Sequence, residues 1–75
     1  MAEVMTRIVI DPEILSGKPV IKGTRIPVYL IIELLGHGIP EKEILRQYPT
    51  LTEDDIKAAL LYASKCIENE EVITF

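Results

Sequence analysis

Hydrophobic residues form short β-branched runs in the first third of the chain and recur at helical spacing after that. Ile8-Val9-Ile10 ends at Asp11-Pro12, which predicts a short strand followed by a turn. Val20-Ile21 predicts a second extended segment, because Gly and Pro residues lie on both sides of it. From residue 28 onward, apolar residues three or four positions apart predict helices. The expected fold is therefore mainly α, with a short strand pair or hairpin before the helices.

The first predicted helix is VYLIIELLGHG, which begins at Val28 and stops at Gly36 or Gly38. Pro27 is suited to the first helical position, where a missing N–H costs nothing. Glu33 is the only charged interruption in this segment, and a helix so apolar must be covered on several sides. The residues expected to form the core or a dimer contact are Val28, Ile31, Ile32 and Leu35.

Two more helices are predicted, and Pro49-Thr50-Leu51 connects them. The first follows Pro40 over residues 41–48 and has one apolar face, made by Ile44, Leu45 and Tyr48. Thr52 is expected to cap the second, because a hydroxyl residue followed three positions later by Asp55 fits a capping box. The apolar stripe of this last helix contains Ile56, Ala59, Leu60, Ala63, Cys66 and Ile67.

Cys66, Leu61 and Phe75, all in the C-terminal region, can each be interpreted in two ways. The stripe predicts that Cys66 fills the core and is not a reactive thiol. Leu61 falls among charged residues on the outer face, either as an ordinary exposed leucine or as a contact residue for a partner. Residues 71–75 predict a short strand or a docking segment that ends in Phe75, the alternative being a frayed end.

The chain has 75 residues, enough for one domain that spans 1–75, with a core region at about 7–66 and a tail at 67–75. So small a domain buries too little surface for ample stability, and disulfides, metals or self-association commonly compensate. Cys66 has no second cysteine to pair with, and with His37, the only histidine, it cannot complete a four-ligand zinc site. We therefore expect a homodimer without metal or other cofactor.

The sequence offers no nucleotide site or catalytic group. Gly17 and Gly23 have the wrong spacing for a phosphate-binding loop, and Lys22 precedes its glycine instead of following it. His37 has no evident nucleophile to activate and suits a helix C-terminus. We expect a non-enzymatic protein with no small-molecule substrate. The absence of a long apolar segment or a signal-peptide pattern predicts a cytoplasmic location and no contact with a membrane.

Charge is distributed unevenly along the chain. The net charge is −4, but residues 1–25 carry four basic against three acidic groups, whereas residues 26–75 carry four basic against nine acidic groups. The predicted helices also match a known DNA-binding arrangement. Three helices with a short connection between the last two match a helix-turn-helix, in which the last helix would contact DNA bases. Its first turn here holds Glu53, Asp54 and Asp55, which oppose a polyanion. Candidate DNA contacts are Arg7, Lys18, Lys22, Arg25, Lys42 and Arg46. An alternative for Arg25 is an ion pair with a carboxylate, such as that of Glu33, that braces the Gly/Pro corner.

Several motifs together resemble the bacterial and archaeal family called domain of unknown function 433. They are Gly17-Lys18-Pro19, Gly23-Thr24-Arg25-Ile26-Pro27-Val28, Tyr48-Pro49-Thr50-Leu51-Thr52, Asp55-Ile56 and Ala59-Leu60-Leu61-Tyr62-Ala63. The resemblance covers about residues 7–66. It implies a helix-turn-helix domain of the homeodomain or winged-helix type.

The resemblance also implies a role. Members of the family are often encoded beside a small PIN-like protein, a ribonuclease by its resemblance, and are treated as antitoxins of the VapB type. Such a protein would bind its toxin and, as a dimer, the operator DNA. The partner-contact candidates are Leu61 and Phe75. The alternative is a protein-interaction module that does not bind DNA.

Overall fold

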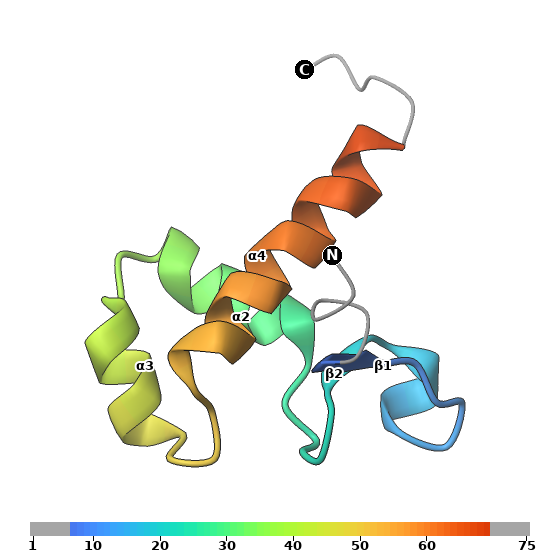
Figure 1. Ribbon diagram of the computed structural model, residues 1–75, viewed down its shortest axis with the longest axis horizontal. Helices are drawn as coiled ribbons and strands as arrows, with labels where there is room; N and C mark the ends of the chain where they lie inside the picture. The colour runs from blue at the N-terminus through green and yellow to red at the C-terminus, as the bar shows by residue number, and fades with distance from the viewer. Residues whose placement is uncertain (1–6, 70–75) are drawn as a thin grey trace.

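The computed structural model describes residues 7–69, which form an antiparallel strand pair followed by three helices (Figure 1). In the strand pair, Ile8 lies opposite Ile21 and Val9 lies opposite Val20. This architecture confirms the predicted fold class, a mainly helical domain with three helices after a short hairpin. The predicted C-terminal strand and Phe75 lie outside the described residues. The elements are β1 (Ile8–Val9), the 3₁₀ turn η1 (Leu15–Gly17), β2 (Val20–Ile21), α2 (Val28–Gly36), α3 (Glu41–Gln47) and α4 (Glu53–Glu68).

The first strand is one residue shorter than predicted. Ile10 lies outside β1 and is 59% exposed. The reason is the turn that begins at Asp11, whose carbonyl accepts a hydrogen bond from the Ile14 N–H at 2.9 Å. The Asp11 carboxylate also accepts from the Glu13 N–H at 2.9 Å. An aspartate that bonds its own backbone two residues on favours a turn over a continued ladder.

Helix α2 begins at Val28, and Pro27 is its N-cap rather than its first helical residue. Pro27 keeps an extended backbone, with φ −75° and ψ 149°, and forms a β-bridge with Val20. The predicted stop is confirmed, because the helix ends at Gly36 and Gly38 takes φ +85°. Glycine adopts this left-handed conformation without the steric cost that other residues bear.

The predicted cap of α4 is also confirmed. The Thr52 hydroxyl accepts from the Asp55 N–H at 3.2 Å, and the Asp55 carboxylate accepts from the Thr52 N–H at 3.0 Å. These reciprocal bonds complete a capping box, so two N–H groups that a helix start leaves unpaired are satisfied.

The core lies where β2, α2, α3 and α4 meet. Of the residues proposed for the core or a dimer contact, Val28 and Ile31 are buried within the chain itself, while Ile32 and Leu35 pack against the core and are half-buried. The central cluster consists of Ile21, Val28, Ile31, Ile44, Leu51, Ile56 and Ala59.

Helix α4 projects beyond this core, and the prediction that Cys66 fills the core is wrong. Ile56 and Ala59 are buried as expected, but Cys66 is exposed, Ile67 is 71% exposed and Leu60 is 47% exposed. The physical reason is length. Sixteen residues span about 24 Å, and the last turns of α4 extend past α2, a helix of nine residues (Figure 1).

Within residues 7–69, no helix is long and apolar enough to cross a membrane.

Candidate functional site

The Gly/Pro corner before α2 is held by its own backbone. The Thr24 N–H donates to the Ile21 carbonyl at 3.0 Å, and the Ile21 N–H donates to the Ile26 carbonyl at 3.0 Å. Gly23 takes φ +80° at the third position of this turn, where a type II turn requires a left-handed backbone.

The Thr24 side chain adds a second set of bonds to the corner. Its hydroxyl donates to the Ile21 carbonyl at 2.7 Å and accepts from the Ile26 N–H at 3.0 Å. The Val28 N–H donates to the Pro19 carbonyl at 2.9 Å, which fixes the start of α2 beside β2. A phosphate-binding loop needs N–H groups free to point at an anion. Those of Ile21, Thr24, Ile26 and Val28 are used within the fold, so the corner serves as a scaffold.

Three basic candidates project from this scaffold. Lys18, Lys22 and Arg25 are all exposed. In the part of the chain that the structure describes, Arg25 forms no ion pair with Glu33, so the proposed brace is not observed. The corner therefore holds three cationic side chains at the surface.

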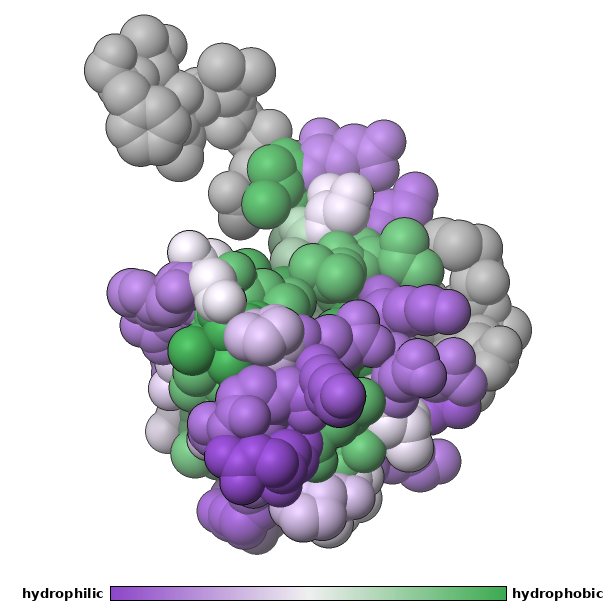
Figure 2. Space-filling model, turned by 90° about the vertical axis from the view of Figure 1, so that its left-hand side faces the viewer, coloured by the Kyte–Doolittle hydropathy of each residue, from purple (hydrophilic) through white to green (hydrophobic). Residues whose placement is uncertain are grey.

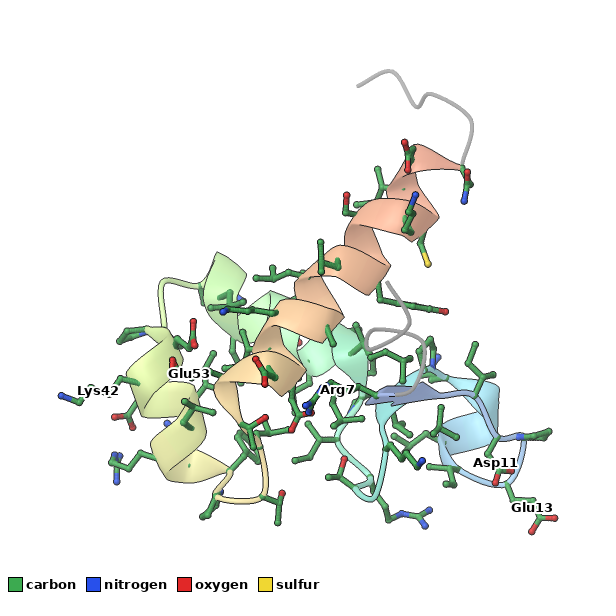
Figure 3. The ribbon with its side chains drawn as sticks, viewed as in Figure 1. Arg7, Asp11, Glu13, Lys42 and Glu53 are labelled. Atoms are coloured by element: carbon green, nitrogen blue, oxygen red, sulfur yellow. The ribbon has the colours of Figure 1, made fainter. Side chains whose placement is uncertain are left out.

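Arg7 is placed differently from the other basic candidates. Its Nη1 lies 2.9 Å from Oδ1 of Asp55, whose side chain is only 10% exposed, and its Nη2 lies 3.6 Å from Oδ2 of Asp54 (Figure 3). The pair joins the residue before β1 to the first turn of α4, and it offsets part of the negative charge there. Sequence reasoning missed this pair, since 48 positions separate Arg7 from Asp55. The only signal in the sequence was the run of three acidic residues at 53–55, whose negative charge a nearby basic side chain would offset.

The two basic candidates on α3 are both exposed, and Arg46 is bound to its own helix. Arg46 Nε donates to Glu43 Oε1 at 3.0 Å, and its Nη2 donates to Oε2. These bonds, with a further one from Gln47, hold the pKa of Glu43 well below its ordinary value of 4.5. Lys42 lines a shallow hollow with two carboxylate residues, Glu41 and Glu53. Arg46 is thus paired with an acid and Lys42 lies near two acids, and in Figure 3 Lys42 is at the left edge of the domain, away from Arg7 near its centre.

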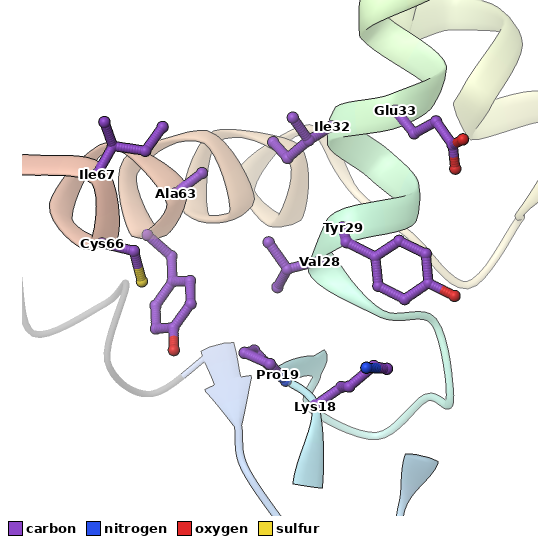
Figure 4. A pocket seen from close by; sticks show the side chains of 10 residues that line it. Lys18, Pro19, Val28, Tyr29, Ile32, Glu33, Ala63, Cys66 and Ile67 are labelled. Atoms are coloured by element: carbon purple, nitrogen blue, oxygen red, sulfur yellow. The ribbon is translucent and has the colours of Figure 1, made fainter. Parts of the chain in front are cut away.

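A groove of about 650 Å³ lies between α2 and α4, and we call it the α2–α4 groove (Figure 4). Its lining is mostly apolar, with Lys18 and Glu33 as the charged residues. Partial burial, with a further contribution from Cys66, raises the pKa of Tyr62 above its ordinary value. The full lining is Lys18, Pro19, Val28, Tyr29, Ile32, Glu33, Tyr62, Ala63, Cys66 and Ile67.

Apolar surface continues around α4 from this groove. A second hollow shares Ile32, Ala63 and Ile67 with the groove and adds Leu60. Figure 2 shows hydrophobic surface that reaches from the body of the domain onto the projecting end of α4. Leu61 is 48% exposed beside Leu60, as the sequence predicted.

Residues 7–69 contain no group of three or more His, Cys, Asp or Glu side chains placed to hold a metal ion. His37, the C-cap of α2, is exposed. The surface features of the described residues are thus an apolar groove, a projecting helix and a basic corner.

Comparison with known proteins places these features in a family. A crystal structure of a DUF433 member from Anabaena variabilis superposes with a TM-score of 0.80 at 36% sequence identity, over 89% of this chain and 66% of that one. The uncharacterized protein y4eO of Sinorhizobium fredii is 38% identical over 53 residues, which is 71% of this chain and 24% of that protein. An uncharacterized protein of Archaeoglobus fulgidus is 67% identical over 24 residues, 32% of this chain and 67% of that protein.

This chain therefore spans about a quarter of the length of the Sinorhizobium relative and about two thirds of the other two. The family model described as "Protein of unknown function (DUF433)" matches residues 8–63, from β1 through most of α4. The chain belongs to the DUF433 family.

Proposed function

We propose that this protein is a regulatory binding domain of the antitoxin type, which captures a small PIN-like toxin protein through the outer face of α4. The observation that carries the proposal is the pair of adjacent leucines there, Leu60 at 47% and Leu61 at 48% exposure. Two neighbouring exposed leucines on a projecting helix form a contiguous apolar patch of the kind that marks contact sites. The kind of partner follows from the family resemblance.

The charges around this patch agree with a protein partner. Asp54 and Glu68 are exposed near Leu61, together with Lys57 and Lys65, and the chain as a whole carries −4. A basic nuclease would be attracted by this net charge during encounter, and the leucines would supply the buried contact.

We expect Leu61→Asp to weaken toxin capture by about 5- to 30-fold, because a buried apolar contact at the centre of an interface contributes about 1–2 kcal/mol. The measurement is a binding titration with the product of the reading frame adjacent to this gene, which we expect to be a PIN-like protein. Leu61 is half-exposed, so the variant should keep the circular dichroism spectrum of the native chain.

The matched control is Ile10→Asp, the same kind of change at an exposed apolar residue after β1. It should bind the toxin like the native chain. Unchanged capture by the Leu61→Asp variant would exclude the outer face of α4 as the toxin contact. Unfolding of that variant would assign Leu61 a structural role instead.

Operator DNA is the second proposed ligand, and the exposed basic corner of Lys18, Lys22 and Arg25 favours it. The start of α4 opposes it, because Glu53 and Asp54 are exposed where a recognition helix approaches the bases. DNA would therefore be held through the corner and its phosphates.

We expect Lys22→Glu/Arg25→Glu to abolish binding to the DNA upstream of the gene, in a fluorescence titration at several salt concentrations. Each lost phosphate contact should also make the slope of log affinity against log salt shallower by about 0.9. Lys57→Glu/Lys65→Glu is the matched control, with the same charge change on α4. Equally weak binding of the native chain to every DNA sequence would exclude operator binding. The protein would then be a protein-interaction module that does not recognise an operator.

A further inference from the structure

The α2–α4 groove lies along the side of α4 that packs into the core nearer its N-terminus. Ile56 and Ala59 are buried on this side, and Ala63, Cys66 and Ile67 continue the same stripe beyond the core. An apolar stripe that continues beyond the core is more stable when another element packs against its whole length. In the described chain, nothing covers its second half.

The opposite wall of the groove is apolar as well. Tyr29 and Ile32 line it from α2, and Tyr29 is 56% exposed (Figure 4). Tyrosine combines a large apolar ring with a polar tip, and is enriched in protein interfaces for that reason. An occupant of the groove must therefore present apolar side chains of its own.

The charge of the groove indicates which occupant fits. Its charged lining residues are one cation, Lys18, and one anion, Glu33, so the face is neutral while the whole chain carries −4. A groove that binds a basic partner would be expected to have acidic residues around its edge, and this groove has no excess of them. Two copies of this chain repel each other because both are acidic. The repulsion is weakest where the neutral groove of one copy faces the same groove of the other.

The shape of the α4 stripe also suits self-association. Ala63 is a small residue one turn before Ile67, which is larger and 71% exposed. A small residue next to a larger one lets a second helix approach closely, with its own large side chain beside the small one. A two-fold contact uses the same patch on both copies, so a stripe with this order can pack against itself in the antiparallel sense.

We propose that the α2–α4 groove is occupied by a second copy of this chain, with the projecting end of α4 of each copy lying in the groove of the other around a two-fold axis near Ala63 and Cys66. This interface leaves Leu61, on the outer face of α4, free for the toxin. It does not depend on the toxin contact, and either can fail without the other.

Sedimentation equilibrium of the full chain at micromolar concentration should give twice the 8.5 kDa mass of one chain. Ile67→Glu should give the mass of a single chain, because a charge would enter the apolar groove. Tyr29→Glu should have the same effect from the other wall. Both side chains are more than half exposed in one chain, so each variant should keep the native circular dichroism spectrum.

Leu61→Glu is the matched control and should remain a dimer, since it adds the same charge on the other side of α4. Raising the ionic strength from about 0.05 to about 0.5 M should leave the dimer intact, because screening weakens charge contacts and not apolar ones.

Cys66, the only cysteine, supplies an independent test. A short bis-maleimide should join two native chains and fail to join two Ile67→Glu chains.

A single-chain mass for the native protein would overturn the proposal. So would a dimer that Ile67→Glu and Tyr29→Glu leave unchanged, which would place the contact on another face. If the native chain is monomeric and Ile67→Glu abolishes toxin capture, the groove belongs to the toxin.

Discussion

Ile31→Ala is expected to lower the free energy of unfolding by about 3–4 kcal/mol, within the range measured for buried Ile-to-Ala changes. Ile31 has no exposed surface and lies at the centre of the cluster that α2, α3 and α4 share. The total stability of a 75-residue domain is about 4–11 kcal/mol. The loss would therefore remove about a quarter or more of that stability, and urea denaturation measures it directly.

The control is Ile10→Ala, which removes the same atoms from a side chain that is 59% exposed. Its effect should stay within about 0.5 kcal/mol. A loss below about 1 kcal/mol for Ile31→Ala would mean that the site refills, and the packing around α2 described above would then be wrong.

Asp55→Ala should cost about 2 kcal/mol, more than an ordinary helix cap contributes. The change removes the bond from the Thr52 N–H and the ion pair with Arg7 together, and it leaves that N–H without its partner. Thermal unfolding measures the loss. Asp54→Ala is the matched control, because its side chain is 60% exposed and its contact with Arg7 is longer, at 3.6 Å. It should cost less than about 0.5 kcal/mol.

A double-mutant cycle separates the two parts of the Asp55 effect. Arg7→Ala, Asp55→Ala and the double variant should give a coupling of about 0.5–1 kcal/mol, since Arg7 is one third exposed and solvent weakens the pair. A coupling near zero would show that the capping box accounts for the whole effect and that Arg7 does not connect the strand pair to α4.

Local features of this fold could be predicted because their causes lie within a few residues. The Thr52 cap and the stop at Gly36 each depend on side chains and backbone groups less than one turn apart. Pro27 shows the limit of such rules. Its preference for the first helical position is real, yet the bridge to Val20 holds it one position earlier in extended form.

The features of the candidate site that depend on distant contacts could not be predicted. The apolar stripe of α4 was correctly identified as a stripe, but periodicity does not show where α2 ceases to cover it. Cys66 was therefore wrongly expected to fill the core, and Ile67 on the same stripe is also exposed. Arg7 was grouped with the basic corner on charge alone. Its partner Asp55 became visible only when the strand pair was placed beside α4.

The projection of α4 past the core gives one helix two levels of local stability. The turns near Ile56 can open only if the whole domain unfolds, because they are packed into the core. The last turns have little more than their own hydrogen bonds, and an isolated helix of that length is marginal in water. Backbone amide protons should therefore exchange with solvent progressively faster from the middle of α4 to its end. Anything that binds the end would suppress that gradient by ordering a segment that is only partly ordered by itself.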